Sequence, residues 1–310
     1  MVNLFIALLK EARPRQWIKN LGVFAAIIFT GQLFNPNAFY TSLQAFYCFC
    51  LFSSATYVLN DLLDKKRDQL HPVKKFRPVS SGQIPAPLAW VYLLVLLIGG
   101  FWLAAGTTPS FLFIAFLYLV LQLLYSVFLK HIAVLDILSL AFGYILRVLA
   151  GEFASGYHVT FWLLICVISL SLYLAIGKRR TEMTLLAKFK ENTRPALGHY
   201  SSKLLDAYLA MFANSTWFSY ALFTFLEPPI APNYPLIYYI EDLFPAGLTR
   251  KWLVITIPFV LYGLMRYTQL IYEKKEGESP EKVLLGDKPL LSTVVIWALI
   301  VIFLIYVVGR

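Results

Sequence analysis

The chain has 310 residues, of which 59% are hydrophobic and only 14% are charged, and its formal net charge is +10. A soluble domain carries roughly 25% charged residues, so this composition excludes an ordinary soluble protein and indicates a surface that faces lipid. The basic residues lie between long apolar runs rather than along one polar face, which argues against a nucleic-acid partner and favours a membrane.

The pattern of apolar residues predicts an entirely helical chain. Residues 1–14 predict a short interfacial helix, because apolar residues such as Phe5 and Leu9 are followed closely by Lys10 and Arg13. A helix that crosses the hydrocarbon needs about 20 apolar residues. Nine stretches meet that need: residues 18–34, 39–59, 88–106, 110–129, 133–151, 159–177, 206–226, 252–272 and 290–308. We expect an all-α integral membrane fold, with nine transmembrane helices in one bundle and a single domain over residues 1–310.

Helix-breaking residues separate several of these spans. They are Asn35-Pro36, Pro85 with Pro87, Thr108-Pro109 and Pro289. Of the 27 lysines and arginines, 22 fall in the N-terminal segment and in alternate connections. Positive residues accumulate on the cytoplasmic side of a membrane, so the N-terminus is expected in the cytoplasm and the C-terminus outside.

Three connections are long enough to carry side chains with a function. Residues 60–87 and 178–205 hold 13 of the basic residues and are expected to be cytoplasmic active-site loops. Residues 227–251 contain five prolines and several aromatic residues, and are expected to lie along the outer interface. The first two connections are therefore the expected place of the chemistry.

The most informative stretch is Asn60-Asp61-Leu-Leu-Asp64-Lys-Lys-Arg-Asp68. If the second span continues as a helix, Asp61, Asp64 and Asp68 share one face. Three carboxylates on one stripe repel each other unless a cation lies between them, and Mg²⁺ takes one or two carboxylates and shares substrate phosphate. We therefore expect Mg²⁺ here, with Asn60 as a further ligand. The alternative interpretation is a solvated charge run balanced by the basic residues that follow it.

Cations follow the carboxylates directly. Lys75 and Arg77 belong to His-Pro-Val-Lys-Lys-Phe-Arg-Pro, and these side chains bind phosphate as a point charge and as a planar fork. Asp136, Ser139, Gly143 and Arg147 form one polar stripe of the fifth span. Arg147 at that depth should face a bundle interior or a wet cavity, or else form a structural ion pair with an acid on another helix.

Other polar residues are candidates for the same site. Lys19 opens the first span, and Tyr125 and Lys130 close the fourth. The sixth span ends in Lys178-Arg179-Arg180-Thr-Glu182. Arg266 in the eighth span is either a buried cation or a side chain that reaches the cytoplasmic edge.

At these residues the chain resembles the UbiA superfamily of intramembrane prenyltransferases. The hallmark of that superfamily, N-D-x-x-D-x-x-x-D followed by R-P-x-x-x-G, is matched by Asn60, Asp61, Asp64 and Asp68 and by Arg77, Pro78 and Gly82. Within it, the chain resembles the decaprenyl-phosphate phosphoribosyltransferase branch over essentially its whole length. The shared stretches are RPRQWIKN, HPVKKFRPVSSG, YSVFLKH, AVLDI, GYILRVLAG, GKRRTE and LLGDKPLL.

The resemblance implies a Mg²⁺-dependent glycosyltransferase of the bacterial cytoplasmic membrane. It would move 5-phosphoribose from phosphoribosyl diphosphate to a polyprenyl (decaprenyl) phosphate, for arabinan precursors of the cell wall, on the cytoplasmic side. Catalytic Asp61, Asp64 and Asp68, with Asn60, would hold the metal. The substrate-binding residues would be Lys19, Asn60, Lys75, Arg77, Tyr125, Lys130, Asp136, Arg147, Lys178, Arg179, Glu182 and Arg266. A homo-oligomer is compatible with the sequence.

One departure from the superfamily pattern bears on the substrate. Ordinary members have a second aspartate motif after the sixth span, whereas this chain has Lys178, Arg179 and Arg180 with only Glu182. A site that takes two phosphomonoesters and a diphosphate needs more direct cations and fewer carboxylates. The alternatives are a prenyltransferase that moves an isoprenoid from its diphosphate to an aromatic or other acceptor, a transporter or channel, and a scaffold.

Overall fold

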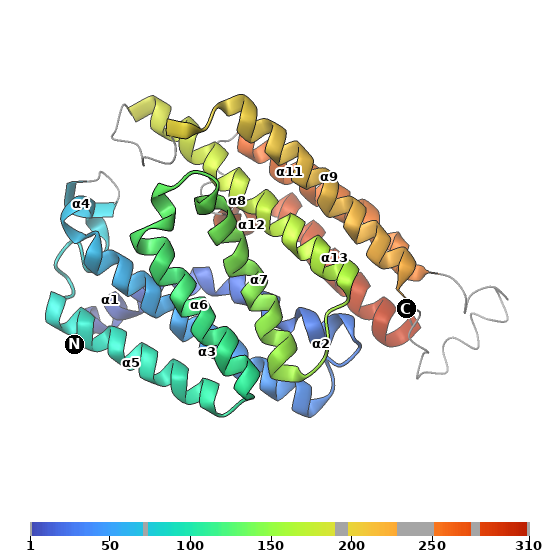
Figure 1. The fold of residues 1–310 in the computed structure, drawn as a ribbon, viewed down its shortest axis with the longest axis horizontal. Helices are drawn as coiled ribbons and strands as arrows, with labels where there is room; N and C mark the ends of the chain where they lie inside the picture. The colour runs from blue at the N-terminus through green and yellow to red at the C-terminus, as the bar shows by residue number, and fades with distance from the viewer. Residues whose placement is uncertain (1, 71–73, 190–197, 228–250, 274–279, 309–310) are drawn as a thin grey trace. The chain divides into compact units, whose positions relative to one another are not determined.

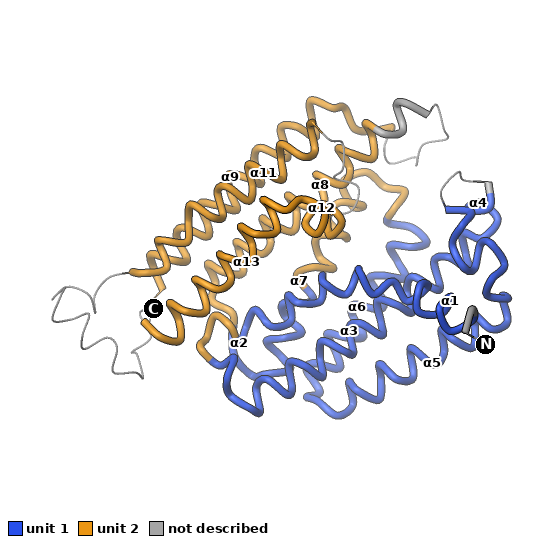
Figure 2. The backbone as a smooth tube through the Cα atoms, turned by 180° about the vertical axis from the view of Figure 1, so that it is seen from behind, with its two compact units in different colours: residues 1–27, 32–129, 146–158 blue, residues 28–31, 130–145, 159–310 orange. Residues whose placement is uncertain are grey.

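The computed structural model describes residues 2–70, 74–189, 198–227, 251–273 and 280–308, and every regular element among them is a helix (Figure 1). These helices form two compact units, which are described separately (Figure 2). Unit 1 comprises residues 1–27, 32–129 and 146–158. Unit 2 comprises residues 28–31, 130–145 and 159–310.

Helix starts follow the breakers in the sequence. Helix α3 (Pro36–Leu63) begins after Asn35, whose side chain accepts hydrogen bonds from the backbone N–H groups of Asn37 and Ala38. Thr108 caps α6 (Pro109–Val127) and Asp287 caps α13 (Lys288–Phe303) in the same way. Such caps satisfy N–H groups that have no partner within the helix, and proline is favoured in the first turn. The breakers therefore predict these three boundaries correctly.

Unit 1 is built around α3. Its other complete elements are α1 (Val2–Ala12), the 3-10 helix η1 (Pro14–Phe24), α4 (Lys65–Leu70), η2 (Lys74–Phe76), α5 (Ala86–Ala105) and α6. Three further elements belong to it in part: the start of α2 (Ala25–Phe29), the first residue of η3 (Leu129–His131) and the second half of α7 (Leu135–Ser155). Phe49, Phe52, Phe111 and Tyr118 are fully buried between α3, α5 and α6. A second buried cluster joins α1, α3 and α5. Burial of these large side chains holds the unit together.

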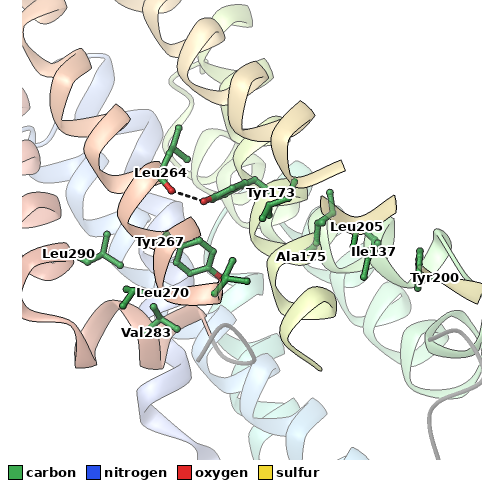
Figure 3. Close-up of a cluster of buried hydrophobic side chains, with 13 residues drawn as sticks. Ile137, Tyr173, Ala175, Tyr200, Leu205, Leu264, Tyr267, Leu270, Val283 and Leu290 are labelled. Carbon is green, nitrogen blue, oxygen red and sulfur yellow. Dashed lines mark hydrogen bonds between the residues drawn. The ribbon is translucent and has the colours of Figure 1, made fainter. Parts of the chain in front are cut away.

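Unit 2 contains the first half of α7, α8 (Phe161–Phe189), α9 (Ser202–Leu226), η6 (Trp252–Thr256), α11 (Ile257–Glu273), α12 (Pro280–Gly286), α13 and the π-helical turn η7 (Leu304–Val308). Its core is a cluster of buried side chains from α7, α8, α9, α11, α12 and α13 (Figure 3). Within it, the Tyr173 hydroxyl donates to the Leu264 carbonyl oxygen at 2.8 Å. The Tyr173 hydroxyl thus has a hydrogen-bond partner inside an apolar core.

The chain is an integral, multi-pass membrane protein. Seven helical segments among the described residues are long and apolar enough to cross a membrane. The nine expected spans are not all confirmed. The expected span 18–34 is divided between η1 and the short α2, and α9, which covers 206–226, is not among the seven. The sidedness of the termini stays a prediction.

The three long connections expected from the sequence differ in how much of each is helical and how much the structure describes. Residues 60–87 are partly helical, because α3 continues to Leu63 and is followed by α4 and η2. In 178–205, α8 continues to Phe189. Apart from its first and last residues, the expected outer loop 227–251 lies outside the described residues, as do His71 and the connection 190–197.

Candidate active site

The first polar cluster lies in unit 1, around the end of α3. Asp61 and Asp68 are almost fully buried, with 1% and 3% exposure. The Arg13 Nη2 group donates to both oxygens of Asp61 at 2.7 Å. Arg77 Nη1 donates to Asp61 Oδ1 at 2.8 Å and to Asp68 Oδ2 at 2.6 Å. Two carboxylates and two guanidinium groups therefore form one network.

The donor set of this network fits Mg²⁺. Asp61 and Asp68 converge on a single nitrogen, Arg77 Nη1, so the fold already brings two carboxylates to one cation. Mg²⁺ needs one or two carboxylates and completes its shell with water and phosphate. Among the described residues, however, no three His, Cys, Asp or Glu side chains group as a metal site. The wider ligand set that adds Asn60 and Asp64 stays a prediction.

The backbone at Asp64 differs from one uninterrupted helix. Helix α3 ends at Leu63, Asp64 is a turn residue with φ −89° and ψ 5°, and α4 starts at Lys65. The helical spacing nevertheless persists, because the Asp64 N–H donates to the Asn60 carbonyl oxygen and the Asp68 N–H to that of Asp64. Asp61 and Asp68 are buried, whereas Asp64 and Asn60 are half-buried.

Two members of this cluster were not singled out from the sequence. Arg13, which was counted only as a membrane-side charge, has φ 52° and ψ 60°, a left-handed conformation that is uncommon outside glycine. Glu11 on α1 is 1% exposed. The sequence feature that could have identified Glu11 is its spacing. Glu11 lies four residues after Ala7 and therefore on the buried face of an amphipathic helix.

Glu11 should make stability fall as the pH rises. Burial, with the nearby charge of Asp61, raises its pKa from 4.5 to about 8. Between these two pKa values the unfolded chain releases the proton while the folded chain keeps it. The free energy of unfolding therefore falls by up to about 1.4 kcal/mol for each pH unit. Glu11→Gln should remove this loss, which thermal unfolding in detergent from pH 4 to 9 would measure.

The matched control is Glu273→Gln, which replaces an exposed acid on α11. It should keep the wild-type pH dependence. An equal slope in wild type and Glu11→Gln would contradict the assignment of the buried proton to Glu11.

A second group of polar residues is buried deeper in unit 1. Arg147, only 6% exposed, donates from Nε to Asn20 Oδ1 at 2.7 Å and from Nη2 to the Tyr118 hydroxyl at 2.9 Å. Asn20 Nδ2 in turn donates to Cys50 Sγ and Ser53 Oγ, which orients its oxygen toward Arg147. The two partners Asn20 and Tyr118 are neutral groups. Both interpretations of Arg147 from the sequence, a cation that faces a cavity and a structural ion pair with an acid on another helix, stay predictions.

A third polar cluster lies in unit 2. Arg179 is fully buried, and its Nε lies 2.5 Å from Asp136 Oδ2, while its Nη1 donates to Glu182. The Tyr200 hydroxyl donates to Asp136 Oδ1 at 2.7 Å. Asp136, Arg179 and Glu182, each a candidate from the sequence, are therefore neighbours in unit 2. The guanidinium of Arg179 is enclosed between two carboxylates, and its expected phosphate contact stays a prediction.

The remaining predicted residues fall on both units. Lys19 Nζ donates to Gln16 Oε1, and Lys75 is exposed with its ammonium 5.1 Å from the Phe76 ring centroid. Tyr125, Lys130 and Lys178 are half-buried on α6, η3 and α8. The binding roles of these residues stay predictions.

Arg266 has a structural partner. Its Nε and Nη2 donate to the two oxygens of Asp287 at 3.1 and 2.7 Å, and Asp287 also caps α13 through the Leu290 N–H. A paired fork of this kind fixes geometry well. The pair joins α11 to the start of α13. The two interpretations of Arg266 from the sequence, a buried cation or a side chain that reaches the cytoplasmic edge, stay predictions.

Comparison with known sequences gives consistent results. The model of the UbiA prenyltransferase family matches residues 21–286. A decaprenyl-phosphate phosphoribosyltransferase from Corynebacterium glutamicum is 32% identical over 98% of this chain and 88% of its own length. The protein of the same name from Mycolicibacterium smegmatis is 31% identical over 95% of this chain and 91% of its own.

Solved structures share the fold. A UbiA homolog from Archaeoglobus fulgidus, bound to GPP and Mg²⁺, superimposes with a TM-score of 0.70. The alignment covers 95% of this chain and 98% of that one, at 18% identity. The same homolog bound to DMAPP and Mg²⁺ gives a TM-score of 0.68. At this identity the likeness concerns the fold.

Proposed function

The chain belongs to the UbiA prenyltransferase family and is a transferase, and from that premise we propose that it moves 5-phosphoribose from phosphoribosyl diphosphate to a polyprenyl phosphate, releasing diphosphate. The observation that carries the proposal is the composition of the unit 2 cluster: Lys178, Arg179 and Arg180 stand with Glu182 where a second aspartate motif would serve a second metal. The names of the two relatives support the same reaction.

The unit 1 cluster is proposed to bind the diphosphate. Asp61 and Asp68 would hold Mg²⁺, which supplies positive charge to the leaving group when it is bound. Arg13 lies within hydrogen-bond distance of Asp61, and Arg77 of both Asp61 and Asp68, so phosphate oxygens near the metal would come within reach of two guanidinium groups. Lys19 and Lys75 add cations, and Asn60 and Asp64 are further candidates for the metal shell.

The lipid phosphate is the proposed nucleophile. Its oxygen attacks the anomeric carbon of ribose, the bond from that carbon to the diphosphate oxygen breaks, and the electron pair leaves with the diphosphate. A phosphomonoester has a second pKa near about 6, so it is largely ionised at neutral pH and needs no general base. Negative charge grows on the leaving group, where fixed cations stabilise it.

The unit 2 cluster is proposed to bind phosphate and to orient the sugar. Lys130 and Lys178 are the proposed ligands of this cluster for phosphate groups of phosphoribosyl diphosphate, and the lipid phosphate is not assigned to them. Arg179 holds Asp136 and Glu182 in place, and these carboxylates can accept hydrogen bonds from ribose hydroxyls. Arg147, which contacts Asn20 and Tyr118, is the proposed cation for phosphate inside unit 1.

The distribution of lysine and arginine supports a reaction on the cytoplasmic side of the membrane. The proposal includes a bacterial cytoplasmic membrane and a product used for cell-wall polysaccharide precursors. The second candidate is transfer of an isoprenoid from its diphosphate, which the family name and the solved relatives favour. Offering labelled phosphoribosyl diphosphate and labelled prenyl diphosphate to the same preparation separates the two. We expect the ribose label in the lipid fraction; prenyl label transferred to an acceptor instead would favour the second candidate.

A further inference from the structure

Tyr200 makes contacts that neither the sequence motifs nor the proposed reaction explains. It lies just before α9 and is 7% exposed. Its hydroxyl accepts a hydrogen bond from the Val134 backbone N–H at 2.5 Å and donates one to Asp136 Oδ1 at 2.7 Å. A phenol has one donor and accepts through its oxygen, so this group binds two positions of the α6–α7 connection at once.

Val134 has a backbone conformation that requires such support. Its φ is 68°, in the left-handed region, and it is one of two non-glycine residues with positive φ among those described. A β-branched residue there is a genuine outlier, because its side chain crowds the following carbonyl oxygen. Strained residues of this kind persist only where their surroundings hold them, and they cluster at functional sites.

The strained residue sits between two parts of the proposed site. Lys130 lies on η3, four residues before Val134, and Asp136 lies in the first turn of α7, two residues after it. The direction in which the chain leaves η3 therefore depends on the backbone at Val134. Tyr200 fixes that backbone and Asp136 together, so it fixes where Lys130 lies relative to Asp136.

The same network reaches α8. Asp136 binds Tyr200 with one oxygen and Arg179 with the other, and Arg179 also pairs with Glu182. Lys178 is the residue before Arg179. Burial raises the pKa of Tyr200, so its hydroxyl remains a donor throughout the neutral range. The contacts run from Tyr200, just before α9, through one hydroxyl to Val134 and Asp136, and from Asp136 to Arg179, the sequence neighbour of Lys178.

We propose that Tyr200 is a positioning residue that sets Lys130, and through Asp136 and Arg179 also Lys178, for phosphate binding. This inference depends on the proposed function in one respect, because the proposed function gives those lysines their role in phosphate binding. It predicts a specific defect when the hydroxyl alone is removed: weaker binding of phosphate groups in a chain that still folds.

The test uses Tyr200→Phe in the full chain, purified in detergent, with inorganic diphosphate as the probe. Calorimetric titration should show about a tenfold loss of diphosphate affinity at a temperature well below unfolding. KM for phosphoribosyl diphosphate should rise by a similar factor, while KM for the lipid phosphate stays unchanged. A merely structural role would lower the unfolding temperature and the active fraction, and would leave affinity and KM as in the wild type.

The matched control is Tyr208→Phe, which removes a hydroxyl that makes no hydrogen bond to the part of the chain that the structure describes, two turns into α9. It should bind diphosphate like the wild type. A double-mutant cycle with Lys130→Ala then asks whether Tyr200 acts through Lys130. The effect of Tyr200→Phe should shrink at least threefold in the Lys130→Ala background, because coupled residues are not additive.

Two results would overturn the inference. One is wild-type diphosphate affinity in folded Tyr200→Phe. The other is wild-type affinity in Lys130→Ala, which keeps the test decisive even where Tyr200→Phe does not fold. A chain that binds diphosphate in a Tyr200-dependent way but transfers no phosphoribose would instead contradict the proposed function and leave the positioning role of Tyr200 in place.

Discussion

Replacing Asp61 by asparagine should lower the transfer rate about a thousandfold while the chain still folds. Asp61 accepts hydrogen bonds from Arg13 and Arg77 and converges with Asp68 on one cation. Removing its charge takes away a carboxylate proposed to bind metal at the leaving group, where a single electrostatic group is worth roughly 10²–10³ in rate. The amide oxygen can still accept a hydrogen bond, and both arginines are part-exposed, so water compensates for much of the lost pairing.

Initial rates of labelled lipid formation, together with the unfolding temperature in detergent, measure both parts of this expectation. Asp206→Asn is the matched control, because Asp206 is also paired with an arginine, Arg180, but on the surface of unit 2. The control should retain most of the activity. More than a tenth of the wild-type rate in Asp61→Asn would remove Asp61 from the proposed chemistry.

Replacing Gly151 by alanine should have the largest effect on stability. A Cβ atom at Gly151 would lie 1.8 Å from the Val23 carbonyl oxygen and 2.6 Å from its carbonyl carbon. Both are backbone atoms of η1, which cannot move aside as a flexible side chain can. Because α7 and η1 must separate within unit 1, the cost should reach about 3 kcal/mol or more.

The unfolding temperature and the yield of monodisperse protein report this loss. Gly263→Ala is the control, because Gly263 lies in α11 and an added Cβ there meets no atom within 4 Å. Alanine in a helix is favoured over glycine by about 0.5–1 kcal/mol, so the control should unfold at the same or a slightly higher temperature. An unfolding temperature for Gly151→Ala within two degrees of the wild type would show that the close approach of α7 and η1 is not required.

The local features of the fold were predictable because they depend on neighbours in the sequence. Asn35 and Thr108 cap helices whose first residues are the prolines that follow them. The apolar stretches predict the long helices for the same reason. The first expected span was predicted less well, because η1 begins at Pro14 as a 3-10 helix and only the short α2 follows. A count of apolar residues cannot predict the change from a 3-10 helix to an α-helix.

The candidate site was predictable in its residue types but not in its pairings. Asp61, Arg77, Asp136 and Arg179 were all selected from sequence patterns, and the structure pairs them within each unit. Their partners depend on chain segments that are far apart in the sequence: Arg13 reaches Asp61 across 48 positions and Tyr200 reaches Asp136 across 64. Only tertiary packing sets such contacts. The two carboxylates beside Arg179 are a contact of the same kind, and its expected role at a phosphate stays a prediction.

The most direct test of the central claim is the formation of a ribosylated lipid. Purified chain in detergent would receive phosphoribosyl diphosphate labelled in the ribose and a polyprenyl phosphate, with Mg²⁺ in one sample and EDTA in the other. Labelled lipid that forms only with Mg²⁺, and that Asp61→Asn does not form, is the predicted result. Folded wild-type protein that yields no labelled lipid with acceptors of several chain lengths would contradict phosphoribosyl transfer.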